Sequence, residues 1–236
     1  MHFKANLFLS LLAILVLALL LRLGLWQLDR AQEKQNLLDA QSARIQLEPT
    51  DIMLLGKYDE NSRYLPVSLT GILDNQHQIL IDNQVKQGVA GYFVLAPVKL
   101  ANGLSVLLNR GWVPLGNNRQ ELPDVSTQLK SISVIGRVDN FPSVGIKLKG
   151  ADYLTEGWPA VTQVVDTEKV AQRLGYAVLP FQVLLSAEEP NGYDRQWQPM
   201  KMGPEKHHGY AFQWFALATA WIIIYFVLTI KRRKEE

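Results

Sequence analysis

The sequence predicts an α+β membrane protein in which two terminal transmembrane helices flank a β-rich extracytoplasmic domain, either an antiparallel sheet or a small barrel with one or two helices. Three observations support this fold class. Each end of the chain has an apolar run, the middle contains short segments rich in Val, Ile and Leu, and basic residues lie just outside both apolar runs.

The first apolar run covers residues 7–26, in which Ser10 and Arg22 are the polar residues. A helix rises about 1.5 Å per residue, so twenty residues cross the roughly 30 Å hydrocarbon core of a bilayer. A signal peptide, with Lys4 in its positively charged region, is the alternative interpretation. Because bulky residues follow the run in place of a small-residue cleavage site, we expect an uncleaved transmembrane helix.

The second apolar run covers residues 210–230, and from Ala211 onward it contains no Asp, Glu, Lys, Arg or His. A basic tail, residues 231–236, follows it, and residues 1–6 with Lys4 precede the first run. The positive-inside rule then places both termini in the cytoplasm and residues 27–209 in the periplasm or an equivalent space. We expect a two-span protein of the inner (cytoplasmic) membrane, with lipid bilayer around both helices.

Charge and cysteine content exclude several functions. The net charge of +2 gives no reason to expect a nucleic-acid partner. The chain has no cysteine, which excludes thiol redox chemistry and thiolate metal sites. A middle region of about 180 residues buries enough apolar surface to fold without disulfides.

The middle of the chain predicts one helical extension, a series of strands and one further helix. Residues 26–47 lack Gly and Pro and should continue the first helix. Turn signals separate the expected strands, which are residues 65–73, 77–82, 92–98, 104–114, 132–138 and 181–186. Residues 166–176 predict a helix that Asp166 or Thr167 caps and Gly175 ends.

The sequence does not favour an enzyme. It contains no nucleophile elbow, phosphate loop or dinucleotide fingerprint. The chain has only four histidines, so a metal site in the middle region has few possible ligands; they are His2, His77, His207 and His208. We expect His77 to be an ordinary surface residue. A membrane-anchored sensor would need an output domain, for which the basic tail is too short.

The segment Asn109–Pro114, "NRGWVP", has two interpretations. Arg110 beside an exposed Trp112 would bind an anion or stack on a flat ligand. Alternatively, Gly111 forms a β-bulge and Trp112 fills the core. The pattern alone favours the structural interpretation.

The start of the second apolar run carries a row of residues at helical spacing. His207, Trp214 and Trp221 share one face, with Ala211 and Ala218 between them. Imidazole is a good axial ligand for haem iron, and small residues beside aromatic ones leave room for a flat macrocycle. The alternative is structural, because Trp and Tyr belong to interfacial belts and small residues serve helix packing.

Four segments then carry a resemblance to one known family. They contain, in order, Gly24, Trp26, Gln27, Arg30 and Lys34; Gly88, Gly91, Tyr92, Val94 and Pro97; Asn109, Arg110, Gly111 and Trp112 with Arg119 and Pro123; and His207, Tyr210, Ala211, Trp214 and Phe215. Over nearly the whole chain, these segments resemble the surfeit locus protein 1 family of cytochrome c oxidase assembly factors.

The resemblance implies a non-enzymatic role in maturing a haem-copper terminal oxidase. It implies that the protein binds haem a transiently and aids its insertion into oxidase subunit I, with His207 as the iron ligand. Tyr210, Trp214 and Trp221 are expected around the same haem, and Arg22 near its propionates. Expected partners are subunit I, other oxidase subunits and assembly factors. The alternative is a membrane-anchored scaffold that stabilises nascent oxidase subunits without binding haem.

Overall fold

The computed structural model describes residues 7–56, 58–59, 61–116, 118–119, 121–197 and 203–235. The expected N-terminal segment 1–6 therefore lies outside the described residues. The chain divides into two units, which are described separately. We call Met1–Gln41 with Gln198–Glu236 the helical unit, and Ser42–Trp197 the β unit.

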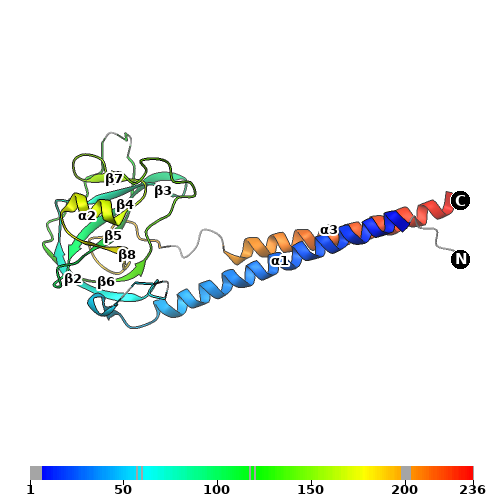
Figure 1. Ribbon diagram of the computed structural model, residues 1–236, viewed down its shortest axis with the longest axis horizontal. Coiled ribbons are helices and arrows are strands. Elements are labelled where there is room, and N and C mark those ends of the chain that lie inside the picture. The colour runs from blue at the N-terminus through cyan, green and yellow to red at the C-terminus, as the bar shows by residue number, and fades with distance from the viewer. Residues whose placement is uncertain are drawn as a thin grey trace. The chain divides into compact units, whose positions relative to one another are not determined.

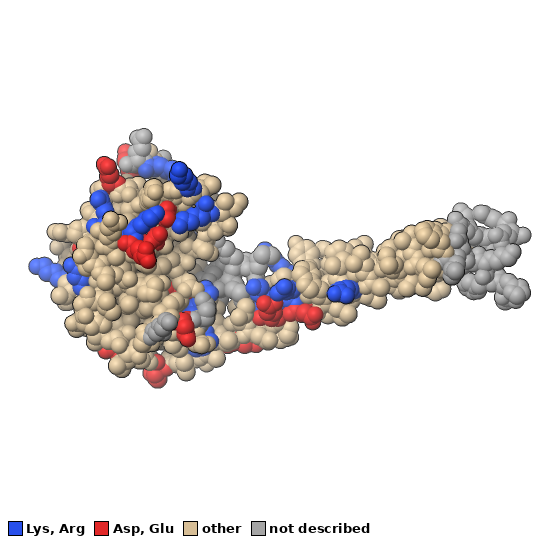
Figure 2. Space-filling model, viewed as in Figure 1, with Lys and Arg blue, Asp and Glu red and all other residues tan. Residues whose placement is uncertain are grey.

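The helical unit contains two long helices, α3 (Pro204–Glu235) and α1 (Leu7–Ile45), and the last four residues of α1 belong to the β unit. Both are long and apolar enough to cross a membrane by length and composition, which is compatible with membrane anchoring. Figure 2 shows a long uncharged stretch along this pair. The helices extend beyond the predicted spans 7–26 and 210–230, and Pro204 is the first residue of α3, where its missing N–H costs nothing.

The two helices lie side by side and antiparallel (Figure 1). Positions of reduced exposure recur every three and four residues along both, which is coiled-coil spacing. They include Ser10, Ala13, Leu17, Leu20, Gly24, Gln27 and Ala31 on α1, and Pro204, His207, Ala211, Trp214, Ala218, Trp221 and Tyr225 on α3. We call these positions the seam. Within it, Trp221 Nε1 donates a hydrogen bond to the Ala13 carbonyl at 3.0 Å.

The β unit contains the predicted strands and two short ones that the sequence did not reveal. Its strands are β1 (Thr50–Asp51), β2 (Pro66–Leu73), β3 (Ile79–Lys86), β4 (Val89–Lys99), β5 (Ser105–Pro114), β6 (Ser131–Asp139), β7 (Ala160–Thr162) and β8 (Val178–Leu185). A 3₁₀ helix, Ile52–Leu54, and the helix α2 (Thr167–Leu174) complete it. The new strands, β1 and β7, have only two and three residues, too few to show a period.

The sheet is a small barrel of mixed direction. Its order is β1-β2-β6-β8-β5-β4-β3-β7, and an additional β2–β4 pairing closes β2, β6, β8, β5 and β4 into a ring. The small barrel was one of the two predicted forms. A purely antiparallel sheet is wrong, because β5 pairs with β8, β3 with β7 and β1 with β2 in parallel. Parallel pairing needs a crossover, and a long connection that includes α2 lets β8 return beside β5.

The core follows the alternation of the strands. On β5, Val106 and Leu108 belong to one buried cluster, whereas Leu107 belongs to another that includes Val170 of α2. The prediction for α2 is confirmed. Asp166 is the cap, since its carboxylate accepts hydrogen bonds from two backbone N–H groups of the first turn, and Gly175 ends the helix with φ of 78°.

Candidate functional site

His207 lies in the first turn of α3, where it faces Gln27 of α1. Its Nδ1 is 2.8 Å from Gln27 Oε1. An amide oxygen only accepts hydrogen bonds, so this contact places a proton on Nδ1 and leaves the lone pair on Nε2. The neighbouring His208 is exposed and lies outside the seam.

The predicted row on α3 is the face that packs against α1. His207, Trp214 and Trp221 all lie on the seam, and Ala211 and Ala218 between them are each only 2% exposed. The row therefore takes part in helix packing, the structural interpretation that the sequence left open. Two other predicted haem neighbours, Tyr210 and Arg22, are exposed and lie off the seam.

The first motif segment, Gly24 to Lys34 on α1, contacts the fourth, His207 to Phe215 on α3, across the seam. A Cβ atom added at Gly24 would come within 2.6 Å of the Phe215 ring, so glycine is what permits this close approach. One turn later, Gln27 reaches His207. Trp26 and Arg30 are exposed, with the Arg30 guanidinium 5.8 Å from the centre of the Trp26 ring. Two segments at least 180 residues apart thus meet at the Gly24–Phe215 and Gln27–His207 contacts.

The donor chemistry of this place fits a haem iron. A neutral imidazole whose Nδ1–H is already bound presents Nε2 as a single axial ligand. Among the residues that the structure describes, no group of three or more His, Cys, Asp or Glu side chains could hold a metal ion instead. In the part of α1 and α3 that the structure describes, His207 and the exposed His208 are the two imidazole groups.

In the β unit, the Asn109–Trp112 segment forms the predicted bulge. Phe93 of β4 pairs with Trp112, and Leu95 pairs with Asn109, so one residue on β4 faces two on β5. Gly111 has φ of 116°, and a Cβ atom there would lie 2.8 Å from the Asp194 carbonyl. Glycine is required at this position both by its backbone angle and by the lack of space.

Trp112 is anchored rather than presented to a ligand. Its Nε1 donates to the Gln84 carbonyl at 2.8 Å. Its ring packs so closely on Gly91 that a Cβ atom at Gly91 would come within 2.5 Å of it. Gly91 and Trp112, which belong to two different motif segments, therefore contact each other directly. The predicted bulge is confirmed, whereas Trp112 is half-buried against Gly91 and is not a member of the buried core.

Arg110 is a buried brace. It is 5% exposed, and its guanidinium donates to Gln78 Oε1 at 2.9 Å and to the carbonyls of Val125 and Asn191. Burial lowers the pKa of Arg110, although Tyr193 opposes the shift. None of the ion pairs formed among the described residues includes Arg110. Arg110 therefore does not form the anion-binding site that was one of the two interpretations of this segment.

Asn109 begins a series of hydrogen bonds that the sequence did not predict. Fully buried, it accepts from the Gly111 N–H and donates to Gln182 Oε1 at 2.9 Å. The Gln182 amide in turn donates to the Asn140 carbonyl at 2.8 Å. The signal available in the sequence was a polar residue, Gln182, in the middle of an otherwise apolar strand.

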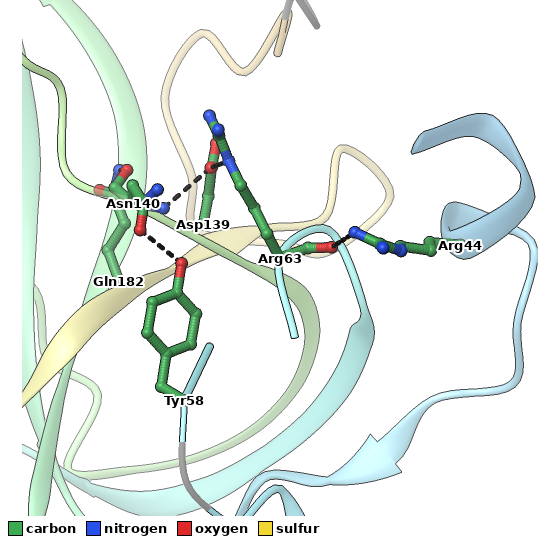
Figure 3. Close-up of polar contacts among 6 residues, drawn as sticks. All are labelled: Arg44, Tyr58, Arg63, Asp139, Asn140 and Gln182. Atoms are coloured by element: carbon green, nitrogen blue, oxygen red, sulfur yellow. Dashed lines mark hydrogen bonds and ion pairs between the residues drawn. The ribbon is translucent and has the colours of Figure 1, made fainter. Parts of the chain in front are cut away.

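Figure 3 shows how these polar contacts continue as far as Arg44. The Tyr58 hydroxyl donates to the Asn140 side chain, and the Arg63 guanidinium pairs with Asp139 at 2.7 Å. Arg44, in the last turn of α1, donates to the Arg63 carbonyl at 3.4 Å. Within the β unit, polar groups thus link the bulge at Gly111 to Arg44.

Comparison with known proteins places the chain in a family. The family model described as the SURF1 family matches residues 14–219. The chain belongs to the SURF1 family. The predicted resemblance is therefore confirmed, and the match includes all four motif segments.

Several SURF1 relatives align over most of the chain. It is 23% identical to a SURF1-like protein of Rickettsia felis over 225 residues, covering 92% of this chain and 95% of that protein. It is 24% identical to a SURF1-like protein of Dictyostelium discoideum, covering 86% and 90%. A shorter match, 31% identical over 94 residues, joins 39% of this chain to 24% of the cytochrome oxidase assembly protein SHY1 of Saccharomyces cerevisiae.

The remaining motif residues of this SURF1 protein have structural roles in the β unit. Gly88 has φ of 81° in the β3–β4 hairpin, which turns within two residues because both strands extend beyond the expected ranges 77–82 and 92–98. Tyr92 is buried, which raises its pKa, as does the nearby charge of Asp82. Arg119 forms an ion pair with Asp82 at 2.9 Å.

His77, expected to be an ordinary surface residue, has specific partners. Its Nδ1 lies 2.9 Å from both carboxylate oxygens of Asp74, and its ring meets the edge of Trp158. Asp74 also accepts from the Tyr176 hydroxyl at 2.8 Å. We call Asp74, His77 and Tyr176 the Asp74 cluster. The interpretation of His77 from sequence was therefore incomplete.

Proposed function

We propose that this SURF1 protein is a membrane-anchored, non-catalytic assembly factor of cytochrome c oxidase. A relative named for cytochrome oxidase assembly supports this role, as does the match of the family model to residues 14–219. The observation that carries the proposal is the meeting of two family motifs at Gln27 and His207. Its partners are then oxidase subunits, subunit I first, and other assembly factors.

In finer detail, we propose that haem a is the cargo and that His207 Nε2 is its iron ligand. The free lone pair on Nε2 supports this assignment. Arg22, exposed on α1, supplies a guanidinium for the propionates, and Tyr210 is an exposed neighbour on α3. Trp214 and Trp221 hold the ligand-bearing helix against α1. One imidazole suits delivery, because cargo must also be released into subunit I.

A scaffold that stabilises nascent oxidase subunits without haem is the second candidate. The observation that favours it is the packed seam, in which the expected pocket walls already contact the partner helix. The two candidates differ in whether the purified protein is coloured.

The deciding experiment is an absorption spectrum of the detergent-purified protein, co-expressed with the enzymes of haem a synthesis. His207→Ala is compared with His208→Ala, a matched control because His208 is exposed and outside the seam. We expect a haem a Soret band in wild type and His208→Ala that is lost in His207→Ala. A colourless wild type would favour the scaffold, and a full band in His207→Ala would refute the ligand assignment.

The proposed topology has both termini in the cytoplasm and the β unit in the periplasm. The cysteine-free chain permits a direct test by labelling one introduced cysteine. Leu54→Cys, at a side chain that is 77% exposed, should react with a membrane-impermeant maleimide added to cells with a permeable outer membrane. Labelling only after lysis would place the β unit on the cytoplasmic side.

A further inference from the structure

We infer that Gln27 is the positioning residue of His207: it fixes the Nδ1–H tautomer and thereby selects Nε2 as the free donor nitrogen. The inference deepens the proposed haem role and rests on it for its functional meaning. Its physical basis is the 2.8 Å contact between His207 Nδ1 and Gln27 Oε1. In a neutral imidazole, the hydrogen bond made by one ring nitrogen decides which nitrogen carries the proton.

The seam holds Gln27 in place for this task. One turn before it, Gly24 lets the Phe215 ring approach, and one turn after it Ala31 is fully buried. Ala211, one turn beyond His207, is also buried. Small residues on both helices therefore let the two backbones approach closely beside the Gln27–His207 pair.

The register of the helices supports the same pairing. Ala13 and Gln27 are fourteen residues apart on α1, as are Trp221 and His207 on α3. Fourteen residues are two heptads, so both hydrogen-bonded pairs occur at equivalent points of one coiled coil. The Gln27–His207 contact is thus a regular part of the seam and not an isolated meeting of two surface side chains.

The group that accepts the hydrogen bond from His207 Nδ1 determines how strongly Nε2 binds iron. An acceptor that binds the other ring nitrogen raises the basicity of a ligating histidine, and a carboxylate does so more strongly than an amide. A neutral glutamine orients the ring without the added charge. It therefore suits a site that must release its cargo, and Gln27→Glu should hold haem more tightly than wild type.

The test uses the full-length, haem-free protein with ¹⁵N-labelled histidine in nanodiscs. The ring-nitrogen shifts of His207, assigned by their loss in His207→Ala, report the tautomer. We expect Nδ1–H in wild type and in Gln27→Glu, and a mixture of tautomers in Gln27→Leu. Gln213→Leu is the matched control, because Gln213 is an exposed glutamine of α3 off the seam, and it should leave the shifts unchanged.

Haem binding gives the second readout. Loss of the hydrogen-bond partner of a ligating histidine typically lowers metal affinity about 10–100-fold, so Gln27→Leu should bind haem a more weakly by that factor. Gln27→Glu should restore binding and lower the midpoint potential of the bound haem. A purely structural role of Gln27 would not move that potential. Disulfide formation between cysteines at positions 20 and 214 verifies that the helices still pair in each variant.

The outcomes separate the inference from the proposed function. A wild-type tautomer that persists in Gln27→Leu overturns the inference even if His207 binds haem. A tautomer that changes as expected, in a protein that binds no haem in any variant, supports control by Gln27 and overturns the haem role. A change in both tautomer and affinity supports both.

Discussion

A buried arginine without a carboxylate is stable only when other groups replace its hydration. Arg110 has this support from Gln78, Val125 and Asn191, and its guanidinium also faces the Tyr193 ring at 5.0 Å. If the guanidinium were removed, the buried Gln78 Oε1 would lose its donor, whereas the Val125 carbonyl would keep its hydrogen bond from Gln78 Nε2. Arg110 and Gln78 therefore stabilise each other.

Arg110→Ala is expected to lower the free energy of unfolding by roughly 3 kcal/mol, because it leaves a cavity and removes the donor of the buried Gln78 Oε1. The control is Arg119→Ala, since that side chain is 56% exposed and its ion pair should contribute at most about 1 kcal/mol. Urea unfolding and the steady-state protein level measure the effect. Lost oxidase activity at an unchanged Arg110→Ala level would instead indicate a partner contact.

The Asp74 cluster predicts a pH dependence. Burial opposes ionisation of Asp74, but contacts with His77 and Tyr176, together with the charge of Lys99, lower its pKa. A carboxyl group whose pKa is lowered in the folded state stabilises the fold above its unfolded pKa, about 3.9, and this stabilisation is lost as the pH falls through the folded pKa.

We therefore expect Asp74→Asn to be less stable than wild type at pH 7, with a difference that shrinks below about pH 4. Urea unfolding at pH 7, 5 and 3 measures this, and Glu121→Gln, at an exposed position, is the control. An equal difference at all three pH values would mean that the carboxylate charge does not matter.

At the level of elements, α2 depends on its two ends. Asp166→Ala removes the acceptor for two backbone N–H groups and should cost about 1 kcal/mol of stability. Thr167→Ala tests the other capping residue that the sequence allowed, and it should be nearly neutral. Thermal unfolding of both variants decides between them, and a larger loss for Thr167→Ala would reverse the assignment.

The seam predicts which positions of α1 and α3 form disulfides. The register defined by Gln27–His207 and Ala13–Trp221 places Leu20 level with Trp214. Cysteines at 20 and 214 should cross-link on mild oxidation, whereas cysteines at 20 and 221 should not, because they lie two helical turns apart. Gel mobility after oxidation measures this, and efficient linkage of the second pair would refute the register.

Much of the β unit was predictable from sequence, because alternating apolar strands and turn residues are local signals. The bulge was also predictable, since Gly111 interrupts a strand that is otherwise Val- and Leu-rich. Parallel pairing of β5 with β8 was not, because it joins residues more than seventy positions apart. The partner of His207 was missed for the same reason: Gln27 was a motif residue, but only the register of two distant helices shows what it contacts.

At the scale of the whole molecule, the β unit has its own core. Its three buried clusters consist of residues from that unit alone. A fragment of residues 42–197 should therefore fold without the helical unit and unfold in one cooperative transition. Circular dichroism with heating tests this, and a fragment without a transition would show that the helices contribute to the fold.

The position of β8 in the ring also has a consequence for synthesis on the ribosome. This last strand lies between β5 and β6, so β5 pairs only with β4, and β6 only with β2, until Leu185 has emerged. At about 5–20 residues per second, the rest of the chain follows within roughly ten seconds. The barrel therefore closes while α3 is being made or afterwards. Any nonsense mutation before Val178 should leave two open strand edges, and the truncated product becomes a target for proteases rather than a partly active protein.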